Sequence, residues 1–465
     1  MIRGRASSYG TFIGALSLAA VVASVYLSPL GTSPTHSKAL SASDSNVKST
    51  SGRTDKRVAA THAHVSSAHT TKSAGSAKTV TRTVTRTLPG QVTKQVVFEP
   101  STAQAPSGTT TSLPAPSSST TTSTSPPSSS TYKVPTKSAL VAPDTDYWGV
   151  SLDGVPQGTS QLNALDAAVE DAPSELTWYQ GWDEPYPAQT VESSWEHEAL
   201  PMITWESKPS QDTTPAQSDP AYSLSDIING NYDTYLRTFA NAVAAEGLPV
   251  VIRLDQEMNG NWFPWSEGVN GNTSGQFVQM WQHVWNIFQA AGANSDVIWL
   301  WAPNRVDNLA HAPALSELYP GDSYVDWIGV DAYWRYTTEA PTFAAVFGRS
   351  LAALAAVTSK PIFIAETAGI ETDPTTGSDV GSQKVQYTTS LLQNIGSDSQ
   401  IVGFSWFNNV ATSSEDGVPI TNDWRIDSDA ANLSAFKSAV STGPFADGLM
   451  PSSGAPVVVV PPGGG

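Results

Sequence analysis

The sequence predicts an α/β protein whose main part is a (β/α)8 TIM barrel, preceded by a disordered linker rich in Ser, Thr and Pro. Two observations predict the barrel. Eight short apolar segments recur between residues 147 and 406, with little of the alternation that a half-exposed strand shows. Amphipathic segments, whose apolar residues recur every three or four positions, separate them. Strand and helix in turn, eight times over about 300 residues, are typical of this barrel.

The predicted strands are all short and apolar, as strands covered on both faces should be: 148–152, 176–179, 200–205, 249–254, 296–301, 325–330, 361–365 and 401–406. One predicted helix covers 235–243 and stops before Gly247. Another covers 277–288, with Ser274 as its N-cap and Gly292 as its end. Further helices are predicted at 343–357, 385–395 and 430–440.

Composition divides the chain into a basic N-terminal part and an acidic remainder. Residues 1–140 hold 14 Lys and Arg against 3 Asp and Glu, whereas residues 141–465 hold 10 against 39. All 15 Trp lie between Trp148 and Trp424. We expect a disordered linker at 32–140, because its Ser, Thr and Pro cannot bury enough apolar surface to fold. One barrel domain at 141–448 and a disordered tail at 449–465 would follow.

Residues 1–31 have the pattern of an export element. Arg3 and Arg5 precede an uncharged run at 11–30, which is typical of a signal peptide and is also long enough for a membrane-spanning helix. No clean small-x-small cleavage site stands at its end, which favours an uncleaved anchor. Either alternative predicts a protein that is secreted or anchored to the outer face of the cell membrane. Scattered Lys and Arg within residues 1–140 could hold it to an anionic envelope.

Composition also argues against several classes of partner. The acidic barrel would repel phosphates, so nucleic acid is not expected as a ligand. The chain has no Cys, which excludes disulfides and thiolate metal sites. His197, His283 and His311 lack metal-ligand spacing, and the Asp-rich loops fit no calcium-binding pattern. We expect a monomer without metal or cofactor, whose ligand is neutral.

Two glutamates stand where a barrel of this kind places its active site, at the carboxyl ends of strands. Glu257 follows the fourth predicted strand, and Glu366 directly follows the seventh. A carboxylate at the end of a buried strand is costly unless it is paired or functional. The fourth and seventh strands lie on opposite sides of the barrel, so the two side chains are expected to face each other across its mouth.

The rest of the predicted rim is rich in indole, amide and carboxylate side chains. Indoles stack on the CH faces of sugars, while amides and carboxylates bond their hydroxyl groups. Glycoside hydrolysis needs two carboxyl groups, which the two glutamates would supply. Trp262, Trp265, Trp299 and Trp301 could each equally be core. Arg253 could serve either the site or a structural ion pair. In strand order the other rim residues are Ser151, Asp153, Trp178, Trp182, Trp205, Glu206, Arg253, Gln256, Trp262, Trp299, Trp301, Asn304, Asp331, Tyr333, Trp334, Trp406 and Asn408.

Five motifs follow one another over roughly residues 147–440: Arg253-x-x-Gln256-Glu257-Met258-Asn259-Gly260-x-Trp262-Phe263-x-Trp265, Trp299-x-Trp301-x-Pro303-Asn304, Asp326-Trp327-Ile328-Gly329-x-Asp331-x-Tyr333, Lys360-Pro361-x-x-x-Ala365-Glu366 and Phe404-x-Trp406-Phe407-Asn408. In this order they resemble glycoside hydrolase family 26. The resemblance implies a retaining barrel glycosidase.

The resemblance also implies roles for individual residues. Glu257 would be the acid/base, with a raised pKa, and Glu366 the nucleophile. Tyr333 would hydrogen-bond the nucleophile, and Trp406 would floor the subsite of the reacting sugar. We further expect substrate contacts from four residues: Gln256, Trp262, Arg253 and Trp205.

One position departs from the family pattern and leaves the sugar open. The mannanases of the family usually carry His before the acid/base, where this chain has Gln256. Related glucan-active enzymes hold an amide there, which bonds the sugar 2-hydroxyl, axial in mannose and equatorial in glucose. We expect β-mannan or glucomannan first, with β-glucan and xylan as alternatives. A non-catalytic cell-envelope protein that binds carbohydrate is the rival from another functional class.

Overall fold

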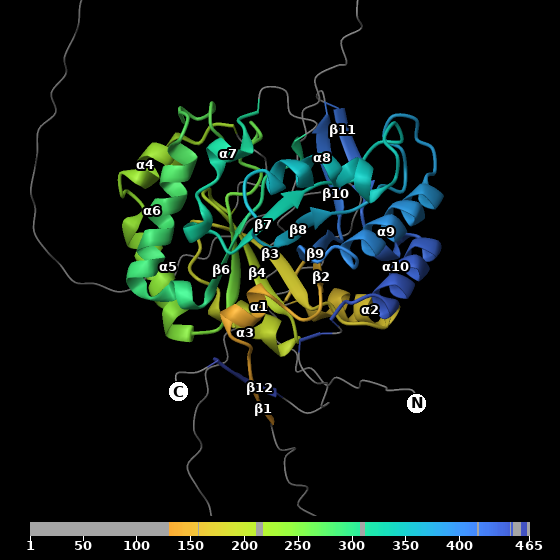
Figure 1. Cartoon of the computed structure of the whole chain (residues 1–465), viewed down its shortest axis with the longest axis horizontal. Helices are drawn as coiled ribbons and strands as arrows, with labels where there is room; N and C mark the ends of the chain where they lie inside the picture. Colours follow the sequence, from red (N-terminus) through yellow and green to blue (C-terminus); the bar gives the residue numbers. More distant parts are fainter. Residues whose placement is uncertain are drawn as a thin grey trace, which may run out of the picture. The chain divides into compact units, whose positions relative to one another are not determined.

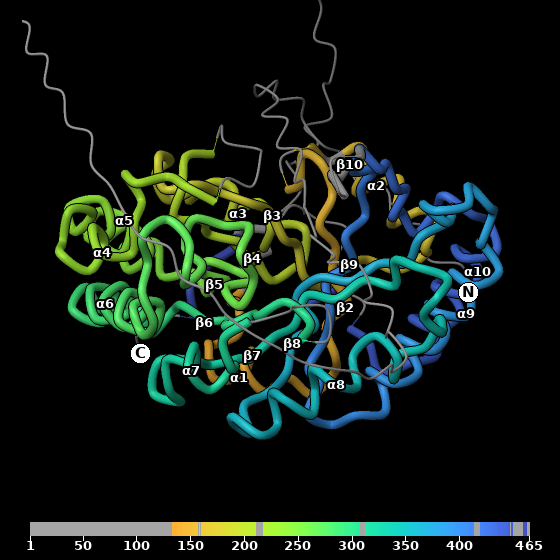
Figure 2. The backbone as a smooth tube through the Cα atoms, turned by 90° about the horizontal axis from the view of Figure 1, so that it is seen from above, coloured from red at the N-terminus to blue at the C-terminus, as the bar shows by residue number. Residues whose placement is uncertain are grey.

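The computed structural model describes residues 130–156, 158–210, 217–306, 312–415, 418–446, 448–449 and 457–462. Within these ranges eight parallel strands close into a barrel in the order β2-β3-β4-β5-β6-β7-β8-β9, and helices surround it (Figures 1 and 2). The predicted (β/α)8 barrel is therefore confirmed. The predicted signal peptide or anchor, and all of the predicted linker before residue 130, lie outside the described residues.

The barrel strands are β2 (Tyr147–Ser151), β3 (Glu175–Gly181), β4 (Leu200–Glu206), β5 (Val250–Leu254), β6 (Val297–Trp301), β7 (Trp327–Asp331), β8 (Ile362–Thr367) and β9 (Ile401–Phe407). Each begins and ends within 2 residues of a predicted strand. The helices are α2 (Thr159–Val169), α3 (Ala188–Glu196), α4 (Leu224–Ile228), α5 (Asp233–Glu246), α6 (Gln276–Ala291), α7 (Leu315–Leu318), α8 (Phe343–Ala355), α9 (Gly381–Ile395) and α10 (Ala430–Thr442). All five predicted helices are present, and Gly292 ends α6 in a left-handed conformation, with φ 80°.

The predicted N-cap of α6 is wrong by one residue. Gly275, not Ser274, holds the cap position, with φ 85°, a conformation that glycine adopts without steric cost. A capping side chain comes from elsewhere, because Glu267 Oε1 accepts hydrogen bonds from the backbone N–H groups of Gly275 (2.8 Å) and Phe277 (3.1 Å). A carboxylate at this end also favours the helix dipole.

Further elements lie around both expected boundaries of the barrel domain. Residues expected in the linker form β1 (Ser130–Lys133), α1 (Lys137–Val141) spans the first boundary, and residues expected in the tail form β12 (Val457–Val460). β1 and β12 pair in parallel, Ser130 with Val457 through Lys133 with Val460. Four consecutive valines favour a strand, and β1 gives this strand a partner that local composition could not reveal.

These added elements lie at the amino ends of the barrel strands, at the bottom of Figure 1. Lys137 of α1 donates to the Asn294 carbonyl (3.1 Å), just before β6, and Trp327 at the start of β7 donates to the Val141 carbonyl (2.9 Å). At the opposite end, a hairpin of β10 (Val410–Glu415) and β11 (Val418–Asp423) follows β9. In the part of the chain that the structure describes, no helix is long and apolar enough to cross a membrane.

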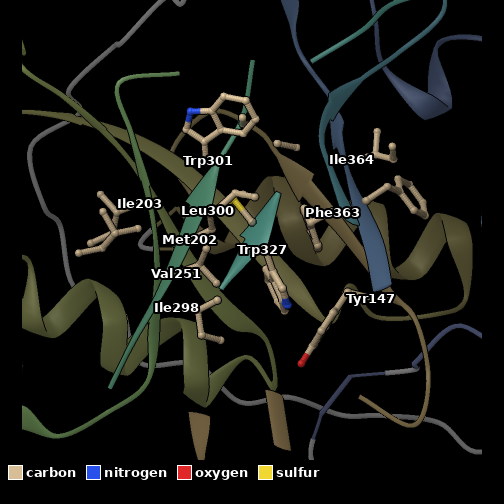
Figure 3. Packing of buried hydrophobic residues seen from close by; sticks show 14 of the residues in the cluster. Tyr147, Met202, Ile203, Val251, Ile298, Leu300, Trp301, Trp327, Phe363 and Ile364 are labelled. Carbon is tan, nitrogen blue, oxygen red and sulfur yellow. The ribbon is translucent and has the colours of Figure 1, made fainter. Parts of the chain in front are cut away.

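The barrel interior has an apolar lower layer and a polar upper layer. Near the amino ends Tyr147, Trp327 and Phe363 pack together, with the rings of Trp327 and Phe363 stacked at 5.3 Å and 7° (Figure 3). Strand side chains alternate between the two faces of the sheet, so polar residues an even number of positions further along a regular strand share the interior. In β8 the register shifts, because Gly329 pairs with Phe363 but Asp331 pairs with Glu366, and Glu366 therefore lies inside although it is three positions after Phe363. Those polar residues are Glu175, Thr177, Tyr179, Thr204, Arg253, Asp331, Glu366 and Ser405, and their mutual contacts are given below. The lower layer supports the polar layer and excludes water from beneath it.

Candidate active site

Glu257 lies in the turn after β5 and has an uncommon backbone conformation. Its φ is 56°, and that of Asp255 is 46°, in the left-handed region that non-glycine residues seldom enter. Two contacts fix the turn. The Glu257 N–H donates to the Ala302 carbonyl (2.9 Å), and the Asp255 carboxylate accepts from the N–H (2.7 Å) and hydroxyl (2.8 Å) of Ser207. The strained turn brings the Glu257 carboxyl group to the carboxyl end of the barrel.

Two hydrogen bonds hold the Glu257 carboxyl group, which is 4% exposed. Trp262 Nε1 donates to Oε2 (2.7 Å), and Asn304 Nδ2 donates to Oε1 (2.6 Å). Asn304 is itself held by a reciprocal pair of bonds with Asn259, each 2.8 Å long. Burial, and next the negative charge of Glu366, raise the pKa of Glu257 to about 7 against these stabilising donors. The raised pKa expected for Glu257 is thus confirmed.

Glu366, at the end of β8, has a different environment. Its Oε1 accepts a hydrogen bond from the Tyr179 hydroxyl (2.6 Å) and forms an ion pair with Arg253, and its Oε2 accepts from the Tyr333 hydroxyl (2.6 Å). Two phenol donors and a guanidinium stabilise the charged form of a carboxyl group. The hydrogen bond expected between Tyr333 and Glu366 is present.

Arg253 connects the two sides of the polar layer. It is fully buried, and its guanidinium donates to Thr204 Oγ1 (2.9 Å), to Asp331 Oδ1 (3.0 Å) and to Glu366. It also lies over the Tyr179 ring, 5.7 Å from the centroid. Arg253 therefore forms ion pairs with both Asp331 and Glu366, and its expected substrate contact stays a prediction.

Gln256 sits beside Glu257 and is 2% exposed. Its Nε2 donates to Glu206 Oε1 (2.9 Å), and Glu206 forms an ion pair with Lys208 (3.4 Å). Because a carboxylate can only accept, this contact turns the Gln256 amide nitrogen toward Glu206. The other amide atom, Oε1, has no hydrogen-bond partner among the described residues.

The structure does not bring Trp205 or Trp406 to the carboxylates. The Trp205 ring stacks on Phe239 of α5 at 4.4 Å, and the Trp406 ring meets the edge of Phe436 of α10 at 5.7 Å. Their neighbours Thr204 and Ser405 point into the barrel, so residues one position later point outward to the helices. Both are fully buried and pack between the sheet and the helices, and their expected substrate contacts stay predictions.

Three residues at the site were not among those expected to act there: Tyr179, Asn304 and Trp424. Asn304 stood on the rim as a strand-end residue, without a role. Tyr179 was hidden within a predicted strand, although Glu175, Thr177 and Tyr179 already form a polar face at period two. In the sequence, Trp424 follows the hairpin strand β11 and does not end a barrel strand. Its ring packs against that of Tyr333, with centroids 5.2 Å apart. No strand-end rule points to it.

Among the described residues, the histidines and acidic clusters show no metal-binding geometry. In the described ranges, no group of three or more His, Asp or Glu side chains is arranged to hold a metal ion. His283 instead contacts Asp233 (2.7 Å) on the outer helices. His311 lies outside the described residues.

A closed parallel barrel with a protonatable glutamate after its fourth strand and a charge-stabilised glutamate after its seventh is the arrangement of a barrel glycoside hydrolase. The sequence narrows this class further. Residues 186–383, which include both glutamates, match the model of glycosyl hydrolase family 26.

Curated relatives carry two kinds of name. Endoglucanase H of Acetivibrio thermocellus is 30% identical over 270 residues, which cover 56% of this chain and 26% of that protein. A mannan endo-1,4-beta-mannosidase of Bacillus subtilis is 29% identical over 94 residues, covering 19% of this chain and 25% of that protein. The chain therefore spans about a quarter of the length of these relatives.

Solved structures with a similar fold include a GH26 beta-mannanase from Bacteroides ovatus, with 15% identity and a TM-score of 0.49, covering 68% of this chain and 95% of that chain. A Cellulomonas fimi endo-beta-1,4-mannanase double mutant has 17% identity and a TM-score of 0.49, covering 70% of this chain and 78% of that chain.

Proposed function

We propose that the protein is a retaining endo-β-glycan hydrolase, with Glu257 as acid/base and Glu366 as nucleophile. The observation that carries the proposal is the unequal environment of the two glutamates. Burial raises the pKa of Glu257, whereas Glu366 forms an ion pair with Arg253 and accepts hydrogen bonds from Tyr179 and Tyr333. The first step of glycoside hydrolysis requires one carboxyl group that is protonated and a second that is charged.

In the first step the Glu366 carboxylate attacks the anomeric carbon, and the bond from that carbon to the glycosidic oxygen breaks. Glu257 gives its proton to the departing oxygen, so a neutral alcohol leaves and an ester to Glu366 remains. Tyr179 and Tyr333 hold the attacking oxygens in place before the reaction. Asn304 and Trp262 hold the Glu257 carboxyl group and orient its proton.

In the second step water attacks the same carbon and the ester bond to Glu366 breaks. Glu257, now charged, accepts a proton from that water and returns to its starting form. Two displacements at one carbon retain its configuration. The hydrogen bonds from Asn304 and Trp262 stabilise the charge that Glu257 carries between the steps.

For the substrate we propose β-mannan or glucomannan first and β-glucan as the alternative. The family match and a relative named as a mannanase support the first. Gln256 and a relative named as an endoglucanase favour the second. Their common chemistry is an uncharged, β-linked polysaccharide, which the acidic chain would not repel.

The test is a substrate panel. The full chain is incubated with galactomannan, glucomannan, mixed-linkage β-glucan and xylan, and new reducing ends are assayed. We expect release from at least one of the four and, by proton NMR, a first product with the β configuration. An α product would refute retention. Absence of release from every glycan, by a protein that unfolds cooperatively, would favour the non-catalytic carbohydrate-binding alternative.

Variants of the two glutamates test the assigned roles. We expect Glu366→Ala to abolish turnover while binding of the glycan, measured by calorimetry, persists. Glu257→Gln, which keeps the shape but cannot give a proton, should lower kcat by roughly 10²–10⁴-fold. Full activity in either variant would refute its role.

We also keep as a proposal that the chain acts outside the cytoplasm, secreted or held at the outer face of the membrane by residues 1–140. The basic flank and apolar run of residues 1–31 support it. Fractionation of cells expressing the full chain tests it, since recovery in the cytoplasmic fraction would refute it.

A further inference from the structure

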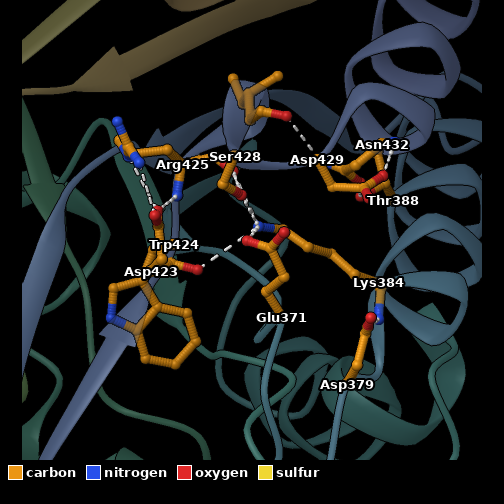
Figure 4. A network of polar contacts seen from close by, with 12 residues as sticks. Glu371, Asp379, Lys384, Thr388, Asp423, Trp424, Arg425, Ser428, Asp429 and Asn432 are labelled. Atoms are coloured by element: carbon orange, nitrogen blue, oxygen red, sulfur yellow. Dashed lines mark hydrogen bonds and ion pairs between the residues drawn. The ribbon is translucent and has the colours of Figure 1, made fainter.

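A buried lysine lies near the site but contacts neither Glu257 nor Glu366. Lys384 of α9 is fully buried, and its ammonium group donates to the Arg425 carbonyl (2.8 Å) and to Ser428 Oγ (2.8 Å), with the Asp423 carbonyl at 3.5 Å (Figure 4). Glu371 Oε2 lies 3.9 Å from the same nitrogen. Burying an ammonium group is costly, so its retention calls for a reason beyond filling space.

The oxygens that Lys384 binds belong to one short segment, residues 423–428, which joins β11 to α10. The two carbonyls are those of the residues on either side of Trp424. Other bonds hold the same segment: the Trp424 N–H donates to the Asn409 carbonyl (3.0 Å), and its own carbonyl accepts from Trp406 Nε1 (2.7 Å). The Ile426 N–H donates to Asn408 Oδ1 (2.7 Å), and the Ile426 carbonyl accepts from Asn432 of α10 (3.0 Å). Lys384 differs from these partners because it is charged and comes from α9, a helix that does not adjoin the segment in the sequence.

Trp424 connects this segment to the site. Its ring, 2% exposed, packs against the Tyr333 ring with centroids 5.2 Å apart. The Arg335 guanidinium lies near both rings, 5.3 Å from that of Trp424 and 5.7 Å from that of Tyr333. The Tyr333 hydroxyl then donates to Glu366 Oε2 (2.6 Å). A displacement of Trp424 would therefore remove a ring that packs against Tyr333 and limits its movement.

We propose that Lys384 is a positioning residue of the site: its ammonium group holds residues 423–428 so that Trp424 presses Tyr333 into hydrogen-bonding distance of Glu366. The inference rests on the proposed function for its catalytic consequence. It gives a role to Trp424, to the hairpin of β10 and β11 that delivers it, and to a buried charge that takes no part in the reaction.

The test replaces Lys384 with Met, which keeps most of the aliphatic stem and removes the ammonium group. In the full chain, amide hydrogen exchange of the peptides covering 423–428 is followed by mass spectrometry. On the panel polysaccharide that the unmodified protein hydrolyses fastest, kcat and KM are measured separately. We expect exchange in 423–428 to rise about tenfold and kcat to fall about tenfold, with KM changed less than about twofold, because misplaced catalytic groups cost rate more than binding.

Lys437→Met is the matched control. Lys437 lies on α10, where it forms a partly exposed ion pair with Glu170 (2.5 Å). The same substitution there should leave both exchange in 423–428 and kcat unchanged. Ser428→Ala serves if Lys384→Met fails to fold, since it removes one acceptor of the ammonium group and should give smaller changes in the same direction.

The possible results separate the two proposals. Unchanged exchange in 423–428, in the Lys384 variant or in its Ser428 substitute, would overturn the inference, as would raised exchange with unchanged kcat. A fall in kcat shared by the Lys437 control would also overturn it, because the effect would not be specific to the segment. If the unmodified protein cleaves none of the four glycans, the proposed function has failed, and the exchange measurement alone decides whether Lys384 holds the segment.

Discussion

Glu257 and Glu366 are the same residue type at the ends of two strands of one barrel, and their neighbours give them opposite tendencies. Glu257 has two neutral hydrogen-bond donors, and burial raises its pKa to about 7. Glu366 has a guanidinium and two phenol donors. The difference in chemistry thus comes from the surrounding side chains, which the motif around each glutamate specifies only in part.

The bond from Trp262 to Glu257 has a measurable consequence. Trp262 Nε1 stabilises the charged carboxylate, so replacing Trp262 with Phe should raise the pKa of Glu257. In the proposed first step the acid form of Glu257 is the active one, so kcat/KM should fall as pH rises through this pKa. We expect the alkaline limb of kcat/KM against pH to move to higher pH in the variant.

Trp265→Phe is the control for that shift. It is the same substitution three residues further along, where the indole donates to the Gln256 carbonyl (2.8 Å) rather than to a titrating group. Its alkaline limb should stay in place. An unmoved or lowered limb in Trp262→Phe would show that the indole does not stabilise the charged form of Glu257.

Both glutamates, Arg253 and Tyr333 could be located from the sequence. In a parallel barrel the carboxyl ends of all strands lie around the same rim, so residues near those ends are expected to lie together. Trp205 and Trp406 pack against helices, and the alternation of inward and outward positions along a strand gives the physical reason. Trp424 could not be found from strand ends, because a hairpin after the last strand brings it back to the site. Whether Gln256 and Trp262 touch substrate stays a prediction.

Among the elements, β2 illustrates how closely the polar interior is packed. A Cβ atom at Gly149 would lie 1.9 Å from Glu175 Oε2, on the neighbouring strand β3. That oxygen is buried and has no hydrogen-bond partner among the described residues. Neither strand can move aside without breaking the closed barrel, so glycine is required here by lack of space.

Gly149→Ala should therefore destabilise the protein, by about 1–3 kcal/mol of unfolding free energy. Gly348→Ala is the opposite case. Gly348 lies within α8, and no atom stands within 4 Å of a Cβ built there, so alanine should stabilise by about 0.5–1 kcal/mol through helix propensity. Denaturant unfolding measures the free energy of unfolding of each variant against that of the unmodified protein. Equal effects of the two substitutions would contradict the packing argument.

The barrel elements were predictable because each carries its own pattern, an apolar run or an amphipathic period. The elements that were missed depend on partners distant in the chain. β1 and β12 pair across more than 300 residues of sequence, so the composition around either one indicates only a tail or a linker. The N-cap of α6 was missed for a similar reason, since its capping carboxylate comes from Glu267 and not from the cap residue.

For the molecule as a whole, several carboxyl groups are buried and favour their protonated form. Burial raises the pKa of Glu175 and of Asp255 to about 8, and that of Glu257 to about 7. Each group then binds a proton more tightly in the folded than in the unfolded state, where its pKa is about 4. The free energy of unfolding should therefore fall as pH rises from about 4 to about 8.

Glu175→Gln tests this dependence, because an amide resembles the protonated acid and cannot ionise. The unmodified protein should lose stability between pH 5 and pH 9, and the variant should lose less, by on the order of 1–3 kcal/mol. Thermal unfolding at pH 5 and pH 9 gives the comparison. Parallel losses in the two proteins would mean that Glu175 is already charged in the folded state at neutral pH.

The pairing of β1 with β12 also determines how the enzyme could be handled. Both strands lie at the amino ends of the barrel strands, so the described chain enters and leaves at the face opposite the mouth that holds Glu257 and Glu366. A solid support or a binding module joined directly at β1 or at β12 would therefore leave the mouth open to a long polymer. Attachment through the hairpin of β10 and β11 would instead place the linkage beside the entrance.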